Sequence, residues 1–372
     1  MSARAARAVL RILGCMRYGI SLYFAHLDAA AAACAQARAI GAHEAFASLH
    51  MPEDDPASFA IRLCEIAELA HRSELRLTVD ISQNSLAALG LTPNTAEKIK
   101  EYGVDAVRVD FGLPDEDIAA LSHRIPLQLN ASTITPAWLD RLLAAGADLT
   151  RVEACHNFYP RRHTGLAREL VAQRNAMWQE HGITVGAFVP GDGLLRTPVC
   201  AGLPTLEAHR GLHPLAAAGE LAGLGCEVVS VGDPLLTERT AAQFAAYAHD
   251  TTVDLTIQVT HPALPAEAAT WLSSRHRERT DPAAQLVRLE DSRAALRHLD
   301  VRGANGPRPA GTITIGNAEL PRYQGEISIS RTDLPADPAC TPIGRVIPQD
   351  LPLLALIGPG TPVTLTRTSL PA

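Results

Sequence analysis

Over the first two thirds of the chain, short runs in which hydrophobic and polar residues alternate are separated by Ala- and Leu-rich segments with a helical pattern. Eight of the runs are rich in β-branched and aromatic residues and predict strands at 17–24, 44–50, 75–82, 105–112, 125–132, 149–157, 183–190 and 226–233. Between them, a helical pattern occupies segments such as 28–40, 56–72, 94–102, 136–145, 165–182 and 237–248. Eight such units match a closed (β/α)8 barrel in number and length. We therefore predict an α/β fold with a TIM-like barrel over residues 16–250.

A doubly wound open sheet is the alternative to this barrel. Such sheets usually carry a glycine-rich phosphate loop after the first strand. The stretch "SLYFAHLD" at 21–28 is not a loop of that kind. The barrel is therefore favoured.

The pattern changes near residue 250. Short alternating strands are predicted at 253–260, 312–317, 325–335, 342–347 and 361–367, separated by proline and glycine, and a helical pattern survives only at 282–298. This pattern of short strands predicts a second, all-β domain over residues 251–372, in the form of a small barrel.

The first fifteen residues do not fit the barrel pattern. They are basic, and Met16 directly precedes the first predicted strand. We expect residues 1–15 to be a disordered extension or a misassigned start. No other segment is apolar for long enough to predict a membrane span.

Composition narrows the classes of partner. The 372 residues are 47% hydrophobic and carry a formal net charge of -7, so no basic field favours nucleic acid. Only two lysines are present, Lys98 and Lys100, so an anion site must use arginine, backbone amides or helix N-termini. Seven scattered cysteines without a CxxC pair indicate neither a disulfide framework nor a zinc site, and a reducing cytoplasm is the simplest interpretation.

Polar side chains gather where the predicted strands end, which is where a barrel of this kind carries its active site. They are His50, Glu53, Asp80, Asp110, Asn130, Ser132, His156, Asn157, Tyr159 and Asp233. In "LRLTVDIS", Asp80 shares a face with Arg76 and Thr78, and in "AVRVDFG", Asp110 shares a face with Arg108. Both aspartates are therefore expected to point into the barrel mouth.

Neighbouring strands lie about 4.8 Å apart, so two carboxylates at their ends could serve as the paired acids of a glycosidase. Alternatively, each aspartate caps the following helix or pairs with Arg76 or Arg108. No His-x-His or HExxH spacing supports a metal site, and none is predicted. Both lysines lie in one helical segment away from any strand end, which argues against Schiff-base chemistry.

A long loop follows the seventh predicted strand, at 190–212. It contains a helix-start pattern at Pro204 and Thr205, and its length and position suggest a lid over the barrel mouth. Glu207, His209 and Arg210 could then reach a substrate.

Four stretches carry a family resemblance: "SLHMPEDD" at 48–55, "HNFYPRRHTGL" at 156–166, "GLPTLEAHR" at 202–210 and "GN…YQGEISI" at 316–329. With them the chain resembles the MupG-type 6-phospho-N-acetylmuramidases from Met16 to near its C-terminus. The resemblance implies a TIM-like barrel joined to a cyclophilin-like β-barrel. It also implies a cytoplasmic glycoside hydrolase that cleaves 6-phospho-N-acetylmuramic acid from N-acetylglucosamine, or a related 6-phospho-glycoside, in cell-wall sugar recovery.

The resemblance, the polar strand ends and the charges of the implied substrate together suggest site residues. Asp80 and Asp110 are the expected catalytic pair, with Glu207 as the substitute for either, and acid and base roles stay open, as do retaining, inverting and substrate-assisted mechanisms. The expected substrate-binding residues are His50, Glu53, Asn130, His156, Asn157, Tyr159, Arg162, His209, Arg210, Arg288, Arg293, Asn317 and Glu326. The arginines among them would hold the phosphate and the lactyl carboxylate of a phosphorylated amino-sugar disaccharide. No cofactor is expected.

Two other functions remain open. One is a metal-dependent sugar-phosphate isomerase or epimerase, and the other is a sugar-phosphate sensor without catalysis. The edges of the β-domain would suit a homodimer. We expect the β-domain to complete the site, because the barrel alone supplies few arginines for a phosphate.

Overall fold

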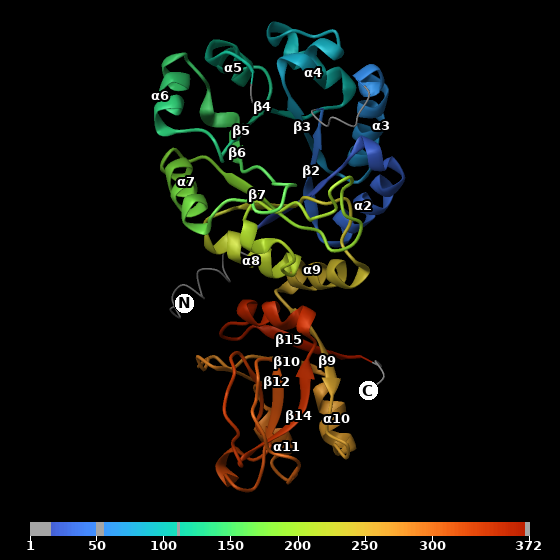
Figure 1. Cartoon of the computed structure of the whole chain (residues 1–372), viewed down its shortest axis with the longest axis vertical. Coiled ribbons are helices and arrows are strands. Elements are labelled where there is room, and N and C mark those ends of the chain that lie inside the picture. Colours follow the sequence, from blue (N-terminus) through green and yellow to red (C-terminus); the bar gives the residue numbers. More distant parts are fainter. Residues whose placement is uncertain (1–15, 50–55, 110–111, 369–372) are drawn as a thin grey trace. The chain divides into compact units, whose positions relative to one another are not determined.

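The computed structural model describes residues 16–49, 56–109 and 112–368 (Figure 1). The chain divides into two compact units, with the division between Ala245 and Ala246. His50, Glu53 and Asp110, three of the predicted site residues, lie outside the described residues.

The first unit is a closed barrel of eight parallel strands, as the alternating pattern predicts (Figure 1). The strands are β1 (Arg17–Ser21), β2 (Ala42–Ser48), β3 (Arg76–Ile81), β4 (Ala106–Val109), β5 (Leu127–Asn130), β6 (Val152–Cys155), β7 (Val185–Val189) and β8 (Val228–Val231). Each strand pairs with the next one along the chain, and β8 pairs with β1 to close the ring. The predicted (β/α)8 barrel is confirmed.

Helices follow the strands and cover the outside of the barrel. They are α2 (Leu27–Ala39), α3 (Phe59–Arg72), α4 (Gln83–Ala88), α5 (Asp115–Ser122), α6 (Pro136–Ala144), α7 (Arg168–Glu180), α8 (Pro214–Gly223) and α9 (Glu238–Asp250), with short 3-10 turns at Phe24–His26, Pro56–Ser58, Leu149–Arg151 and Glu207–His209. The segment predicted as a helix at 94–102 forms a longer 3-10 helix, Pro93–Tyr102. None of the described helices is long and apolar enough to cross a lipid bilayer.

Side chains of alternating polarity line the two faces of the barrel strands. Leu77 and Val79 of β3 are fully buried on the helix-facing side. Arg76 of the same strand points inward, because it reaches Glu153 of β6 across the barrel at 3.4 Å. The period of two therefore separates an apolar outer layer from a polar inner one.

The N-terminal ends of the strands are joined by a cluster of four charges. Arg17 lies 3.0 Å from Glu44 and 2.9 Å from Glu153. Arg76 lies 3.7 Å from Glu44 and 3.4 Å from Glu153. Burial raises the pKa of Glu44, and its two arginine neighbours oppose that shift. Two cations and two anions balance each other at this end of the barrel.

An aromatic cluster fills the inside of the barrel above this charged layer. Phe46 of β2 and Phe188 of β7 pack edge-to-face with their ring centres 5.4 Å apart. Phe158, three residues after β6, packs on Phe188 at 5.1 Å and on Phe46 at 6.2 Å. Such arrangements are favoured by the ring quadrupoles. The trio anchors the segment that follows β6 to the barrel interior.

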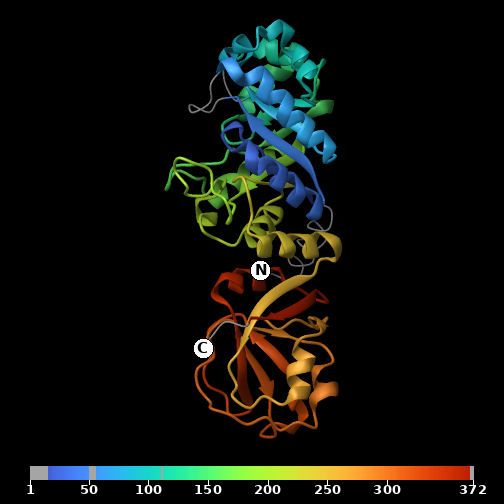
Figure 2. The same cartoon turned by 90° about the vertical axis from the view of Figure 1, so that its right-hand side faces the viewer.

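The second unit is a strongly curled, mixed sheet of seven strands (Figure 2). Its order is β10 (Arg275–Arg277), β15 (Pro362–Arg367), β9 (Val253–Val259), β14 (Cys340–Val346), β12 (Thr312–Gly316), β13 (Ile327–Ser330) and β11 (Leu286–Arg288). Only β15 and β9 are parallel. An isolated bridge pairs Glu278 with Leu289, the residues directly after β10 and β11, so the curled sheet forms a half-barrel in place of the closed small barrel that was predicted.

The helix predicted at 282–298 is wrong for most of its length. The stretch forms β11, which pairs with β13, and then the short helix α11 (Ser292–Leu296). Asp291 has a φ of 63° between them, a left-handed conformation that ends any continuous helix. A further helix, α10 (Ala266–Leu272), and the edge strand β10 were not predicted.

Candidate functional site

A buried ion pair lies at the C-terminal ends of β3 and β4. Arg108 Nη1 is 3.1 Å from Asp80 Oδ1, and the two side chains are 3% and 10% exposed. The strand register brings them together, because Asp80 lies directly opposite Arg108. Arg108 Nη2 also donates to Asn157 Oδ1, two residues beyond β6. One guanidinium therefore connects three strands at the barrel mouth.

This pair decides how Asp80 can act. Asp80 lies on the inner face of the barrel, as the period of two predicts, and it pairs with Arg108, as the alternative interpretation proposed. A guanidinium in contact favours the ionised form of a carboxylate. Asp80 is thus suited to act as a base, a nucleophile or an electrostatic stabiliser. Arg108 was predicted only as a partner of an aspartate and not as a site residue. Its position on the same strand face as Asp110 already indicated that it points into the barrel.

The histidine of "HNFYP" has both ring nitrogens occupied. His156 is fully buried, with Nε2 2.8 Å from Asn175 Oδ1 of α7 and Nδ1 3.2 Å from Ser132 Oγ. Burial lowers its pKa to about 4, so the ring is neutral near pH 7. The Ser132 hydroxyl also accepts a hydrogen bond from the backbone N–H of Asn157 at 2.9 Å. His156 therefore holds this segment against α7 and does not line the mouth.

Asn130 has a similar local role. Its side-chain oxygen accepts from the backbone N–H of Ser132 at 2.9 Å, directly after β5. This Asx-type contact fixes the turn that carries Ser132. The residues around the end of β5 thus support the segment after β6.

Glu207 and Arg210 tie together the segments that follow β6 and β7. Glu207 accepts hydrogen bonds from the backbone N–H groups of His163 at 2.9 Å and Gly165 at 2.8 Å. Arg210 contacts both oxygens of Glu207 at 2.7 Å, and its two terminal nitrogens donate to the carbonyls of Ala201, Gly202, Tyr159 and Arg161. We call this pair the loop clamp. It makes the two segments one structure.

The loop clamp changes the chemistry open to Glu207. The hydrogen bonds from Arg210, His163 and Gly165 lower the pKa of Glu207 to about 2. A carboxyl group with that pKa has no proton to give near pH 7. Its contacts among the described residues hold the loops, so Glu207 does not suit the acid role that was suggested for it.

The lid expected at 190–212 is held by Asp233 over its first two thirds. Asp233, after β8, is 1% exposed and accepts from the backbone N–H groups of Gly191 at 2.8 Å, Arg196 at 3.1 Å and Leu203 at 2.9 Å. The helix start expected at Thr205 is wrong. Its hydroxyl accepts from Phe188 N and donates to Asn157 O, both at 2.9 Å, so it connects β7 to the segment after β6.

His209 and Tyr159 complete the predicted residues of these loops. His209 is fully buried, with Nε2 3.1 Å from Glu220 of α8, and burial lowers its pKa. Tyr159 is half-buried, and its backbone N–H donates to Pro204 O at 3.0 Å. Both residues therefore fasten the long loop to its surroundings.

Arg162 differs from the arginines around it. It is exposed in the segment between β6 and α7, and no hydrogen bond or ion pair of its side chain is found in the described part of the chain. A pocket of about 320 Å³ lies at the ends of β4 and β5, and its lining mixes apolar side chains such as Val109 and Trp138 with the polar ones of Thr133, Thr135 and Arg141. The described part of the barrel rim thus has an exposed guanidinium without a partner and a hollow of mixed polarity.

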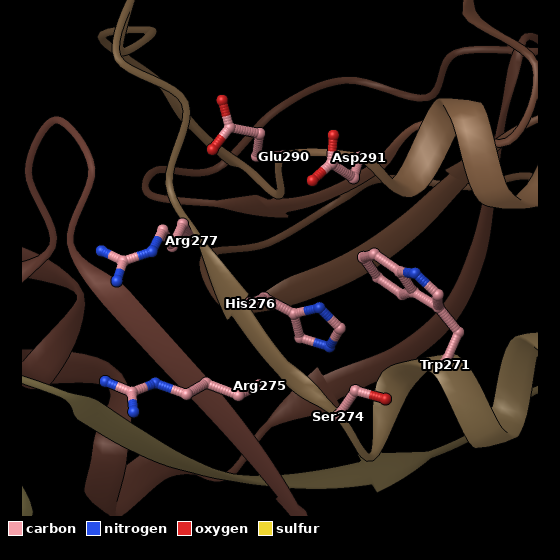
Figure 3. Close-up of a pocket in the computed structure, with 7 residues that line it drawn as sticks. All are labelled: Trp271, Ser274, Arg275, His276, Arg277, Glu290 and Asp291. Carbon is pink, nitrogen blue, oxygen red and sulfur yellow. The ribbon is translucent and has the colours of Figure 1, made fainter.

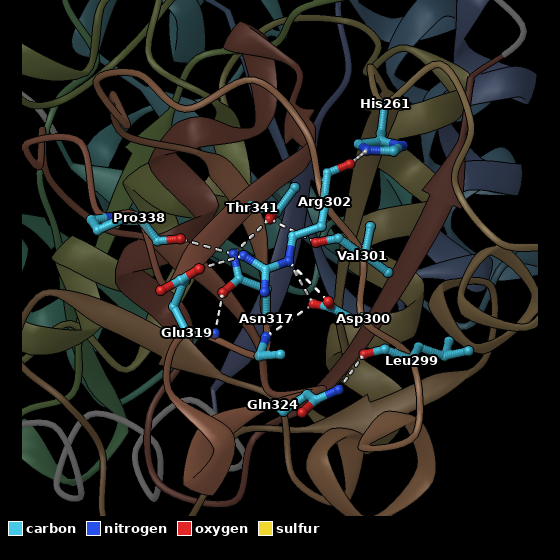
Figure 4. Close-up of polar contacts among 11 residues, drawn as sticks. His261, Leu299, Asp300, Val301, Arg302, Asn317, Glu319, Gln324, Pro338 and Thr341 are labelled. Carbon is cyan, nitrogen blue, oxygen red and sulfur yellow. Dashed lines mark hydrogen bonds and ion pairs between the residues drawn. The ribbon is translucent and has the colours of Figure 1, made fainter.

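The predicted residues of the second unit are engaged locally. Arg288 lies 3.1 Å from Asp281, and the guanidinium of Arg293 lies 5.7 Å from the Tyr323 ring centre. Asn317 donates from Nδ2 to Pro338 O at 2.8 Å and to Thr341 Oγ1 at 3.1 Å (Figure 4). Its Oδ1 accepts from the backbone of Glu319 at 3.0 Å. Glu326 is half-buried directly before β13.

The described residues contain no group of three or more His, Cys, Asp or Glu side chains that could hold a metal ion. Among the described residues, Asp80 and Arg108 place two opposite charges in contact at the mouth.

Comparison with known proteins decides the family. The model of the N-terminal region of 6-phospho-N-acetylmuramidase matches residues 18–246, and that of its C-terminal region matches residues 253–366. The chain belongs to the 6-phospho-N-acetylmuramidase family. The resemblance found in the four sequence stretches is confirmed, and the family's name is that of a glycosidase.

Solved structures of family-like proteins add the fold but not the reaction. A conserved protein of unknown function from Enterococcus faecalis is 35% identical, with a TM-score of 0.86, over 95% of this chain and 97% of that one. An uncharacterised B. cereus protein is 24% identical, with a TM-score of 0.71, over 94% of this chain and 99% of that one. No curated protein matches this chain.

Proposed function

We propose that this protein hydrolyses the glycosidic bond of a 6-phospho-N-acetylmuramic acid linked to N-acetylglucosamine, or of a closely related 6-phospho-glycoside. The family match supports a glycosidase. The observation that carries the proposal is the buried contact between Asp80 and Arg108 at the mouth of the barrel, where enzymes of this fold place their catalytic groups. Its role would be cytoplasmic recovery of cell-wall sugars.

The two aspartates take different roles in this proposal. A glycosidase needs one carboxylic acid that protonates the leaving oxygen and one carboxylate that acts at the anomeric carbon or on a water. Asp80 is the carboxylate, because Arg108 holds it ionised at 3.1 Å. Asp110, which follows β4 in the sequence, is the acid. Asn157 receives a hydrogen bond from Arg108 and keeps the guanidinium oriented toward Asp80.

The 6-phosphate would be recognised by Arg162. Its guanidinium is exposed in the segment between β6 and α7. Arginine presents a planar fork that matches a phosphate with two parallel hydrogen bonds. The loop clamp fixes the backbone on both sides of this arginine, so the fork is presented from a rigid segment.

The test is release of a chromogenic leaving group from 6-phospho-N-acetylmuramide and from its unphosphorylated counterpart, with and without a chelator. Release that requires the phosphate and ignores the chelator supports the proposal. Loss of activity with the chelator favours the metal-dependent isomerase or epimerase. Binding of the phosphorylated sugar without any release favours the sensor.

Variants then test the residues. Asp80→Asn is expected to lower kcat by roughly 10²–10⁴. Arg162→Gln is expected to raise KM about tenfold with kcat nearly unchanged, because it removes a binding contact away from the bond that breaks. Arg151→Gln is the matched control, an exposed arginine before β6 at the opposite end of the barrel. An equal effect of both arginine variants would contradict phosphate recognition by Arg162.

A further inference from the structure

We propose that Ser132 is a positioning residue for Asp80, and that it acts through a chain of buried hydrogen bonds in which every donor and acceptor is fixed. The chain begins at the carbonyl of Leu224, directly after α8, and ends at Asp80 at the barrel mouth. Its catalytic meaning rests on the glycosidase reaction proposed above, whereas the direction of its hydrogen bonds does not.

The first link decides which ring nitrogen of His156 carries the proton. Asn175 of α7 is fully buried, and its Nδ2 lies 2.9 Å from the carbonyl oxygen of Leu224. Because a carbonyl only accepts, the amide NH2 group faces Leu224, and Oδ1 faces His156 Nε2 at 2.8 Å. Oδ1 also only accepts, so Nε2 is the protonated nitrogen.

The second link sets the direction at Ser132. Burial, together with the positive charges of Arg108 and Arg174, lowers the pKa of His156 to about 4. The ring is therefore neutral near pH 7, and its bare Nδ1 accepts. The Ser132 hydroxyl, 3.2 Å away, donates to Nδ1. The same oxygen accepts from the backbone N–H of Asn157 at 2.9 Å.

The third link reaches the proposed catalytic carboxylate. Asn157 Oδ1 accepts from Arg108 Nη2, and a guanidinium only donates, so the orientation of this amide is fixed as well. Arg108 Nη1 then donates to Asp80 Oδ1 at 3.1 Å. Asn157 lies two residues beyond the end of β6, and the Ser132 hydroxyl holds its backbone at that point.

The fixed direction gives the Ser132 hydroxyl an effect on the reaction. Its loss would leave Nδ1 of a buried histidine without a donor and release the backbone of Asn157. Arg108 would then lose a fixed partner and hold Asp80 less rigidly. A small displacement of a reacting group slows the chemical step strongly. We therefore expect the change to act on kcat and to leave KM nearly unchanged, because Asp80 acts at the bond that breaks.

The direction of the chain is tested first, without substrate, by NMR of the full chain with 15N-labelled histidine. Protonated and bare ring nitrogens resonate at distinct frequencies, and the signal that is missing from His156→Gln identifies His156 among the 14 histidines. His276 of the second unit is the internal reference, since its ring is buried, stacks on Trp271 and has Nε2 3.4 Å from Leu272 O (Figure 3).

We expect a proton on Nε2 of His156 and a bare Nδ1. In Ser132→Ala the Nδ1 signal should move, while the signals of His276 stay in place. A proton on Nδ1, or an Nδ1 signal that does not move, would overturn the proposal. The proton is located in the unaltered chain, so this result stays informative if Ser132→Ala does not fold.

The effect on the reaction is tested against a matched serine. Ser122, the last residue of α5, is 1% exposed, and its hydroxyl donates to Ala119 O at 2.6 Å and accepts from Asp148 N at 2.8 Å. It makes the same two kinds of hydrogen bond at the opposite end of the barrel. With chromogenic 6-phospho-N-acetylmuramide, Ser132→Ala should lower kcat about 10- to 100-fold and change KM less than about twofold. Ser122→Ala should change neither, and Ser132→Thr, which keeps the hydroxyl, should retain most of kcat.

The outcomes separate this inference from the proposed function. Equal losses of kcat in Ser132→Ala and Ser122→Ala, or a raised KM with unchanged kcat in Ser132→Ala, would refute the positioning role. A kcat of Ser132→Thr as low as that of Ser132→Ala would refute it too. If the unaltered chain releases no chromogenic group, the proposed function fails, and the ring-nitrogen signals alone then decide whether the chain of hydrogen bonds exists.

Discussion

Replacing Arg108 by methionine tests whether this guanidinium compensates the charge of Asp80. The two side chains are 3% and 10% exposed and lie 3.1 Å apart. Removal of one partner takes the nearest opposite charge away from a buried ion, at a cost of about 3–5 kcal/mol in the free energy of unfolding. Asp80→Asn, which leaves Arg108 in place, is expected to cost about 1–3 kcal/mol.

The double variant makes the experiment decisive. With both charges removed, the loss is expected to be smaller than the sum of the two single losses by about 1–3 kcal/mol. Denaturant unfolding followed by tryptophan fluorescence measures these values. Trp178 is fully buried in the barrel unit, and a Trp271→Phe background removes the signal of the second unit. Additive losses, or a loss below about 1 kcal/mol for Arg108→Met, would refute the compensation of Asp80 by Arg108.

Three further predictions concern the surroundings of the site. Burial lowers the pKa of His156 to about 4 in the folded protein, so on acidification the unfolded chain binds a proton at this histidine before the folded protein does. The free energy of unfolding should therefore fall as the pH drops from about 6.5 to 4. His156→Gln should reduce this dependence in melting curves measured across that pH range. The pKa of Glu207 is lowered to about 2, so its contribution to the free energy of unfolding is fully present above the ordinary pKa and is lost as the pH falls from about 4.5 to 2. Glu207→Gln should flatten the dependence of stability on pH in this range. An unchanged dependence would contradict the loop clamp. Phe188→Ala should cost about 3–5 kcal/mol in denaturant unfolding, because its ring packs on two others in a closed interior, and a loss below about 1 kcal/mol would show that the aromatic cluster is loosely packed.

The barrel was predictable because each of its strands shows a pattern of hydrophobic residues within its own sequence. A buried strand needs one apolar face against the helices, so Leu77 and Val79 mark β3 and leave Asp80 on the inner face. The missed strand β10 reads "RHR" and lies at an edge of its sheet, where only one side chain is buried. This strand is stabilised by its pairing with β15, and such a long-range contact produces no alternation of hydrophobic and polar residues in the sequence.

The place of the polar residues at the strand ends was predictable from the sequence, but their contacts were not. Polar residues lie at the strand ends, but their hydrogen-bond partners come from loops that are distant in the sequence. Glu207 reads as a carboxylate near a mouth, whereas its neighbours at positions 163 and 165 turn it into a structural group. His156 offered a usable signal, because Ala154 and His156 share the parity opposite to Cys155 and Asn157. Applied one residue past β6, the period of two would have placed this histidine outside the barrel.

The loop clamp has a consequence for how relatives of this protein can diverge. Glu207 and Arg210 take hydrogen bonds from, or give them to, backbone groups on both segments, at positions 159, 161, 163, 165, 201 and 202. An insertion or deletion in either segment would shift several of these backbone groups at once and remove hydrogen bonds from the buried Arg210 and the partly exposed Glu207. Sugar preference across the family should therefore change by exchange of single side chains on loops of constant length, and gaps in an alignment should fall elsewhere.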